Sequence, residues 1–365
     1  MSPSPLTTPL TALLGVQHPI MLAGMDQVAG PKLAAAVANA GGFGTLGGAR
    51  YSPQMLREMI AELKEDLKDK NAPFGVDLLL PQVGGSARKT NLIVLWYDYL
   101  KGNLEEMLEI VIESGAKLFV SAVGVAPEWA IEKLHKAGVL YMNMVGHPKH
   151  VHKACRAGAD IICAQGGEAG GHTGDIPTSV LTPACADICK QYTSPMTGKP
   201  VLLVSAGGVN DGRSVAAALM LGASGVWVGT RFITAVESKA PEAAKKQVID
   251  AGYDSWIKST IWSGRPLRAL RNSYIDDWEN NRQAEIKYLT SKGIVPLEHE
   301  LDRLHKDGKL TEEIMDAAEL RPIGIVAGSV NKAGQTAAEI VREIVHETVT
   351  ALNQAPDFVN ASAKL

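Results

Sequence analysis

The chain has 365 residues, of which 46% are hydrophobic and 21% charged, an ordinary composition for a globular protein with a sizeable core. Its 36 basic and 39 acidic residues give a formal net charge of −3. Nucleic acids and anionic membranes bind to strongly basic faces, so we expect neither as a partner. The sequence has no run of about 18 apolar residues that would predict a membrane span. It also has no charged start followed by a long apolar run that would predict a secretory signal.

Four cysteines occur, at Cys155, Cys163, Cys185 and Cys189. Cys163 stands in an apolar run, and Cys185 and Cys189 lie one helical turn apart in an alanine-rich segment. The chain lacks the paired Cys-x-x-Cys motifs with histidines that are typical of zinc sites. We therefore expect reduced structural thiols and no metal.

Short apolar runs that predict buried strands alternate eight times with segments that predict helices. The expected strands are 19–25, 43–48, 72–81, 117–123, 139–145, 160–166, 200–207 and 225–232. The expected helices are 31–40, 52–70, 103–114, 127–137, 148–157, 211–221, a weaker one near 182–192, and an eighth at 238–251. Several of these helices open with proline in the first turn, as helix starts prefer.

Eight βα units predict an α/β fold, a closed (β/α)8 TIM barrel with a helical C-terminal extension. The alternative is an open doubly wound sheet, which the unit count and the glycine-rich loops after several strands disfavour. We expect the barrel at 10–262, a helical extension packed at its mouth at 263–350, and a flexible tail at 351–365. The insertion at 82–102 is long enough for a lid or a binding loop, although some such loops are only ordered decoration.

The predicted strands end in glycine-rich segments, where barrels place their active sites. Loops after the seventh and eighth strands commonly bind phosphate, and Gly207-Gly208 and Gly229-Thr230 occupy those places. Each pair, taken alone, is explained equally well by a tight turn between a strand and a helix, which glycine favours. Two pairs at the two expected strands favour phosphate binding.

The loop after the sixth strand, residues 166–174, is the reactive candidate, because five glycines let its backbone pass close to a planar ring. His172 in this loop titrates near neutral pH and could take a proton from a carbon acid, although a lone histidine is more often a satisfied polar group. Glu168 could shape the loop by accepting backbone N–H bonds or act as a second acid–base group.

At these residues the sequence resembles the nitronate monooxygenase family. The matching segments are 19–25, 41–44, the loop Ala164-Gln165-Gly166-Gly167-Glu168-Ala169-Gly170-Gly171-His172-Thr173-Gly174, then 205–209, 216–223, 228–232 and 264–272. The resemblance implies an FMN enzyme that oxidises alkyl nitronates or nitroalkanes with O2, with His172 as the catalytic residue. The cofactor-binding residues it implies are Ala23, Gly24, Met25, Asp77, Gln165, Gly166, Gly170, Gly171, Ala206, Gly207, Gly208, Gly229 and Thr230.

Two positions depart from the family pattern. Family members often carry asparagine at Asp77, and a polar or basic residue where this chain has Met144-Val145-Gly146. An acidic Asp77 close to a flavin phosphate is electrostatically unfavourable unless it faces elsewhere.

Two other functions stay open. The family that the sequence resembles also includes NAD(P)H-dependent flavin reductases of enoyl thioesters or quinones, which share the glycine-histidine motif. A barrel that binds a phosphorylated ligand without turnover would serve as a sensor or structural subunit. The sequence is compatible with a homodimer. The chain is expected in the cytoplasm, or in peroxisomes of a eukaryote, because Ala363-Lys364-Leu365 is a close variant of the Ser-Lys-Leu address.

Overall fold

The computed structural model describes residues 4–48, 51–80, 100 and 102–359. Eight parallel strands form one sheet, in the order β1-β9-β8-β6-β5-β4-β3-β2. The two ends of that order meet, because the Phe43 N–H donates to the Ile20 carbonyl at 2.8 Å and the Leu22 N–H donates to the Phe43 carbonyl at 2.9 Å. The predicted (β/α)8 barrel is confirmed. Its strands are β1 (Ile20–Leu22), β2 (Gly44–Gly48), β3 (Phe74–Leu79), β4 (Leu118–Ala122), β5 (Leu140–Val145), β6 (Ile161–Gln165), β8 (Leu202–Ala206) and β9 (Gly225–Val228).

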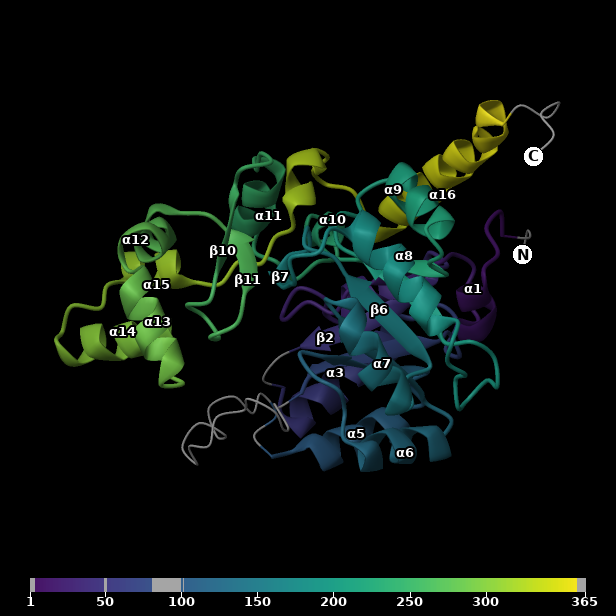
Figure 1. Cartoon of the computed structure of the whole chain (residues 1–365), viewed down its shortest axis with the longest axis horizontal. Helices are drawn as coiled ribbons and strands as arrows, with labels where there is room; N and C mark the ends of the chain where they lie inside the picture. Colours follow the sequence, from purple (N-terminus) through teal and green to yellow (C-terminus); the bar gives the residue numbers. More distant parts are fainter. Residues whose placement is uncertain (1–3, 49–50, 81–99, 101, 360–365) are drawn as a thin grey trace.

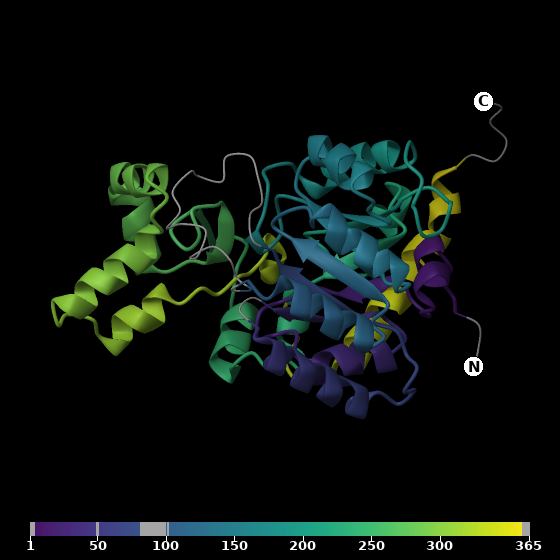
Figure 2. The ribbon, with the colours of Figure 1, turned by 90° about the horizontal axis from the view of Figure 1, so that it is seen from below.

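Helices that follow the strands cover the outside of the barrel (Figures 1 and 2). They are α2 (Pro31–Asn39), α3 (Pro53–Asp66), α5 (Leu104–Glu113), α6 (Glu128–Lys136), α7 (Pro148–Arg156), α8 (Thr178–Cys189) and α9 (Gly212–Met220). α8 begins earlier than its predicted start near residue 182. Its first residue, Thr178, is held by the Glu168 carboxylate, and the helix tolerates Pro183 in its interior.

The helix that completes the barrel comes from the end of the chain. α16 (Ala337–Asn353) packs between α9 and α2, whereas the expected eighth helix, α11 (Glu242–Ile249), contacts α10 and η1 instead. The fit is close: the Gly212 N–H donates to Glu347 at 2.9 Å, and a β-carbon on Gly212 would overlap the backbone of α16. A helix is present within the expected range 238–251, at α11, but the expectation that it completes the barrel was wrong, because local helical periodicity does not say which helix reaches the barrel.

Side chains fill the barrel interior. Residues of alternate strand positions, among them Met21, Val120 and Cys163, form one buried cluster. Leu10 and Leu14 of α1 (Pro9–Leu14) belong to this cluster and close the N-terminal end of the barrel. Buried residues on the opposite faces of the strands pack against the surrounding helices in a second, larger cluster. The interior is therefore solid below the C-terminal strand ends, which leaves the mouth as the place for a ligand.

The last barrel strand is shorter than predicted. β9 ends at Val228, and Thr230–Ile233 turns into the short helix α10 rather than continuing to Phe232. Gly229, with φ −108° and ψ −81°, is where the chain leaves the extended conformation. Phe232 and Ile233 are buried all the same, which explains why the apolar run looked like a continuing strand.

The segment after the barrel is a mixture of strands and helices. β10 (Trp256–Ser259) and β11 (Leu267–Leu270) form a hairpin that pairs with β7 (Gly171–His172) of the sixth loop. Four helices, α12 (Ser273–Asn281), α13 (Gln283–Ser291), α14 (Pro296–Lys306) and α15 (Glu312–Ala318), have a small core of their own and stand away from the barrel (Figure 1).

The chain then returns to the barrel through η1 (Ile325–Ser329), and η2 (Ala355–Phe358) follows α16. Among the described residues, no helix is both long and apolar enough to cross a membrane. Most of the insertion at 82–102 and the terminal Ala363-Lys364-Leu365 lie outside the described residues.

Candidate active site

Small residues form the floor of the barrel mouth. Ala23 and Ala206 belong to the interior cluster at the C-terminal ends of β1 and β8. A β-carbon on Gly229 would lie only 3.5 Å from Ala23 and from the Met25 sulfur, so the ends of β9 and β1 are close neighbours. Gln165 of β6 is the ladder partner of Ala206, and Met144 of β5 packs against the interior cluster. A floor of small groups above a solid core suits a flat ligand.

The sixth loop, residues 166–174, is held by hydrogen bonds from three sides. The Gly166 N–H donates to the Ala206 carbonyl at 2.9 Å, and the Gln165 side chain donates to the His172 carbonyl at 2.5 Å. Arg268 of β11 is buried, lies 4.3 Å from the centre of the Trp256 ring, and donates to the carbonyls of Gly167 and Ala169, the latter at 2.8 Å. This glycine-rich loop therefore has a defined shape, because its carbonyls have charged or amide partners.

His172 is oriented by the hairpin that follows the barrel. It pairs with Leu267 in the β7–β11 ladder, and its Nε2 lies 2.9 Å from the Ser263 Oγ, within hydrogen-bond distance. Burial, with a smaller contribution from the positive charge of Arg265, lowers the pKa of His172 to about 4. The imidazole is therefore neutral at pH 7 and can accept a proton.

Glu168 serves the shape of the loop. Its carboxylate accepts the Thr178 N–H at 2.9 Å and the Thr178 hydroxyl at 2.7 Å, at the N-terminus of α8. Its carbonyl accepts the Ile325 N–H at 3.0 Å. Of the two roles open to Glu168 from the sequence, these contacts favour loop shaping, because the carboxylate is fully engaged with backbone and hydroxyl donors.

The glycines after β8 and β9 differ in their local geometry. Gly207 and Gly208 have φ angles of 93° and 74°, a left-handed turn that side chains rarely adopt. Gly229 precedes α10, and the Thr230 hydroxyl accepts the Gly324 N–H at 3.0 Å. The positive φ angles account for both glycines after β8 as turn formers, so phosphate binding there stays a proposal.

Gly170 and Gly171 meet a segment that sequence reasoning did not connect with the sixth loop. A β-carbon on Gly170 would lie 2.6 Å from the carbonyl carbon of Ile323, and one on Gly324 would lie 2.9 Å from the Glu168 carbonyl oxygen. Gly171 has φ 71°. The chain at 323–325 thus packs directly on the sixth loop. No local signal in the sequence predicts this contact between residues about 150 positions apart.

Asp77 is a buried carboxyl group in the C-terminal half of β3. It is 6% exposed, and its Oδ1 has no hydrogen-bond partner among the residues that the structure describes. Gly24 packs so closely that a β-carbon there would overlap the carboxyl group. Burial raises the pKa of Asp77 to about 8. The side chain is therefore mainly protonated at pH 7, which removes the electrostatic conflict with a phosphate that an ionised aspartate would create.

The geometry thus brings Gln165, Asp77 and the glycine-containing ends of β1, β6, β8 and β9 to one mouth, with His172 in the loop that follows β6. A model of the nitronate monooxygenase family matches residues 7–350. The chain belongs to the nitronate monooxygenase family. Members of this family are flavoproteins, and the chain is an oxidoreductase.

The similar proteins differ in the activities that their names state. The chain is 35% identical over 280 residues to the (3aS,4S,5R,7aS)-5-hydroxy-7a-methyl-1-oxo-octahydro-1H-indene-4-carboxyl-CoA dehydrogenase of Mycobacterium tuberculosis. This alignment covers 76% of this chain and 70% of that protein. FabK from Thermotoga maritima superposes with a TM-score of 0.76 at 26% identity, over 97% of this chain and 100% of that one. Nitroalkane oxidase from Streptomyces ansochromogenes gives a TM-score of 0.72 at 25% identity, over 95% and 99% of the two chains.

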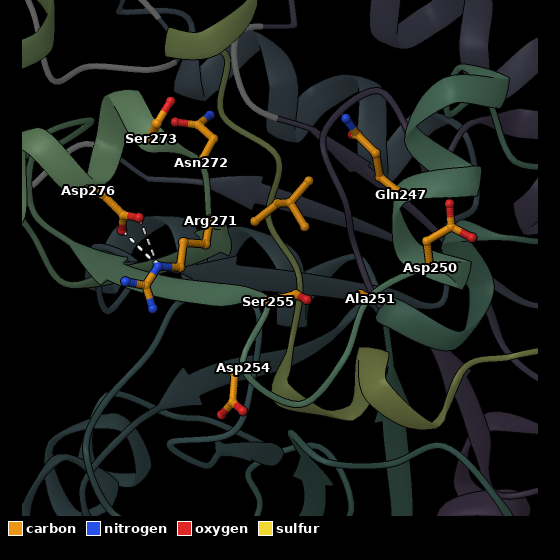
Figure 3. Close-up of a pocket in the computed structure, with 10 residues that line it drawn as sticks. Gln247, Asp250, Ala251, Asp254, Ser255, Arg271, Asn272, Ser273 and Asp276 are labelled. Carbon is orange, nitrogen blue, oxygen red and sulfur yellow. Dashed lines mark hydrogen bonds and ion pairs between the residues drawn. The ribbon is translucent and has the colours of Figure 1, made fainter.

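Two surface clefts of this nitronate monooxygenase family member lie apart from the glycine loops. Each has a volume of about 470 Å3, and both are lined by Asp254, Arg271 and Asp276 between the β10–β11 hairpin and α12. Figure 3 shows the Arg271 side chain against Asp276, with Nε 2.8 Å from the carboxylate, and Asp250 and Asp254 on the rim. Neither cleft is lined by His172 or by a strand end of the barrel.

Proposed function

We propose that this protein binds FMN at the mouth of its barrel and uses O2 to oxidise alkyl nitronates, and the nitroalkanes that give rise to them, to carbonyl compounds and nitrite. The observation that carries the proposal is the state of His172. It is a partly buried, neutral imidazole in the loop after β6, with its Nε2 2.9 Å from the Ser263 hydroxyl. A neutral imidazole in this position can take a proton from the carbon next to a nitro group.

The residues at the mouth fit a flavin. Ala23, Gly24 and Met25 on one side, and Gln165, Gly166, Gly170 and Gly171 on the other, would border the ring, with Ala206 between them. Asp77 offers a buried oxygen that accepts no hydrogen bond from the described part of the chain. Gly207, Gly208, Gly229 and Thr230 would hold the single phosphate of FMN, and the absence of a dinucleotide fingerprint in the sequence favours FMN over FAD. A flavin bound there would supply the redox chemistry, electron transfer from the substrate carbanion to O2.

Anaerobic mixing tests the proposal. Adding a pre-formed nitronate to the protein without O2 should bleach the flavin absorbance in the region of about 450 nm. Readmitting O2 should restore the colour and release nitrite. Mass spectrometry of the heat-released cofactor should give FMN. Recovery of FAD, or a flavin that a nitronate never reduces, contradicts the proposal.

A second candidate function is an NAD(P)H-dependent flavin reductase or dehydrogenase that acts on an acyl thioester. The 35% identity to a carboxyl-CoA dehydrogenase favours it. The same anaerobic experiment separates the two candidates, because NADH alone should reduce the flavin rapidly only in the second case. A substrate with a CoA thioester would then replace the nitronate in the assay.

We also propose a cytoplasmic location, or a peroxisomal one if the source is a eukaryote. A fluorescent protein fused to the N-terminus, with and without Leu365, tests this point. Diffuse fluorescence in both forms rules out the peroxisome.

A further inference from the structure

The loop that joins β10 and β11 connects two barrel strands across the mouth. Ser263 of this loop contacts His172 after β6, with 2.9 Å between the Oγ and Nε2 atoms. Two residues later, Arg265 Nη1 donates to the Val123 carbonyl after β4 at 3.0 Å. The loop therefore fixes a serine and an arginine over the same side of the barrel mouth.

The pairing of β7 with β11 brings Arg265 close to His172. Leu267 is opposite His172, and the Thr173 N–H donates to the Pro266 carbonyl at 3.4 Å. Arg265 lies in the bend directly before this pairing, two residues after Ser263, which contacts the His172 ring. The contribution of Arg265 to the lowered pKa of His172 agrees with this placement.

Val123, the anchor of Arg265, has an unusual backbone. Its φ angle is 68°, in the left-handed region that a β-branched residue rarely adopts. Such strained residues persist where surrounding contacts hold them, and they concentrate at ligand sites. The hydrogen bond from Arg265 is one such contact, and in return the strained turn fixes the position of the guanidinium group.

Based on this geometry, we propose that Arg265 binds the anionic oxygens of the substrate beside His172, so that the site selects a carbanion-derived oxyanion such as a nitronate. Ser263 is a positioning residue that orients the imidazole. A planar guanidinium group matches two oxygens on one atom, as in a nitronate or a carboxylate. This inference rests on the proposed function for its substrate, and the first measurement below does not depend on turnover.

The first measurement is binding of propionate, a carboxylate that resembles a nitronate in charge and shape, to the flavin-loaded protein. The wild-type protein, Arg265→Met, Arg265→Lys and Arg271→Met are compared. Arg271 lies on the same hairpin and pairs with Asp276, so Arg271→Met controls for loss of one arginine. We expect propionate binding to weaken about ten- to a hundredfold in Arg265→Met, to recover in part in Arg265→Lys, and to be unchanged in Arg271→Met.

Histidine NMR supplies a readout that a purely structural role would not change. Removing the positive charge in Arg265→Met should raise the pKa of His172, while Arg265→Lys should leave it close to the wild-type value. Wild-type propionate affinity together with an unchanged His172 titration in Arg265→Met overturns the proposal.

Turnover then separates this inference from the proposed function. If the protein oxidises nitronates, Arg265→Met should raise the KM for the nitronate more than the KM for the neutral nitroalkane. If no nitronate is oxidised by the wild-type protein, the proposed function fails, while Arg265-dependent propionate binding still supports the anion subsite.

Discussion

Replacing Asp77 with asparagine should change how the stability of the protein depends on pH. Asp77 has a pKa of about 8 in the folded protein because it is buried, whereas an aspartate in an unfolded chain titrates near ~3.9. Between these values the unfolded state has lost the proton that the folded state keeps, so rising pH favours unfolding. The slope is about 1.4 kcal/mol per pH unit, which amounts to about 4 kcal/mol between pH 4 and pH 7. Above about pH 8 both states are ionised and the effect levels off.

The assay is urea unfolding followed by tryptophan fluorescence, for the flavin-loaded wild-type protein and Asp77→Asn, at pH values from 4 to 9. Asparagine has nearly the same shape and cannot ionise, so the stability advantage of the variant over wild type should grow with pH by that slope. The difference between the two proteins cancels other titrating groups. Asp302→Asn, on the exposed surface of α14, is the control, and its difference from wild type should stay constant. A constant or shrinking difference for Asp77→Asn would refute the assignment of a neutral, buried carboxyl group.

Three further predictions concern the sixth loop. His172→Asn should keep the flavin but lower kcat/KM for a neutral nitroalkane by about 10²–10⁴-fold, with a smaller loss for a pre-formed nitronate. Equal mild losses on both substrates would count against a catalytic base. In the wild-type enzyme, kcat/KM for the neutral nitroalkane should fall only below about pH 4, where His172 becomes protonated. Gly170→Ala should destabilise the protein by about 1–3 kcal/mol in thermal unfolding, because the new β-carbon would overlap Ile323. The control is Gly124→Ala, which should have little effect because the space around Gly124 is open. Equal effects of the two substitutions would disprove the contact. Glu168→Ala should cost about 1–2 kcal/mol by freeing the N-terminus of α8, and unfolding at the wild-type urea midpoint would show that Thr178 does not depend on this carboxylate.

Local sequence pattern was sufficient for most of the barrel. Strands buried on both faces need continuous apolar runs, so β3 to β6 and β8 were found within two residues of their observed ends. The glycine-rich ends of these strands also pointed to the mouth, because the C-terminal ends of parallel strands meet at one edge of a barrel.

Contacts between distant segments were the part that sequence pattern could not supply. α16 has a clear amphipathic pattern, but nothing in that pattern says that it packs between α2 and α9 rather than in the extension. The two-residue strand β7 is defined only by its partner β11. Ser263 and Arg265 lie in the segment 264–272 or next to it, where a family resemblance was visible, yet their positions beside His172 and Val123 depend on that same long-range pairing.

The position of α16 also has a consequence for how the protein is made. A ribosome releases all eight barrel strands well before it releases Ile340, Val341 and Ile344, the α16 residues buried against the barrel. Until then the nascent chain holds a ring whose seam between α2 and α9 is uncovered, and exposed apolar surface of this kind attracts chaperones and other unfinished chains. The hairpin and the four helices of the extension must be synthesised during that interval. Completion of the barrel therefore waits until synthesis has passed the extension and reached α16.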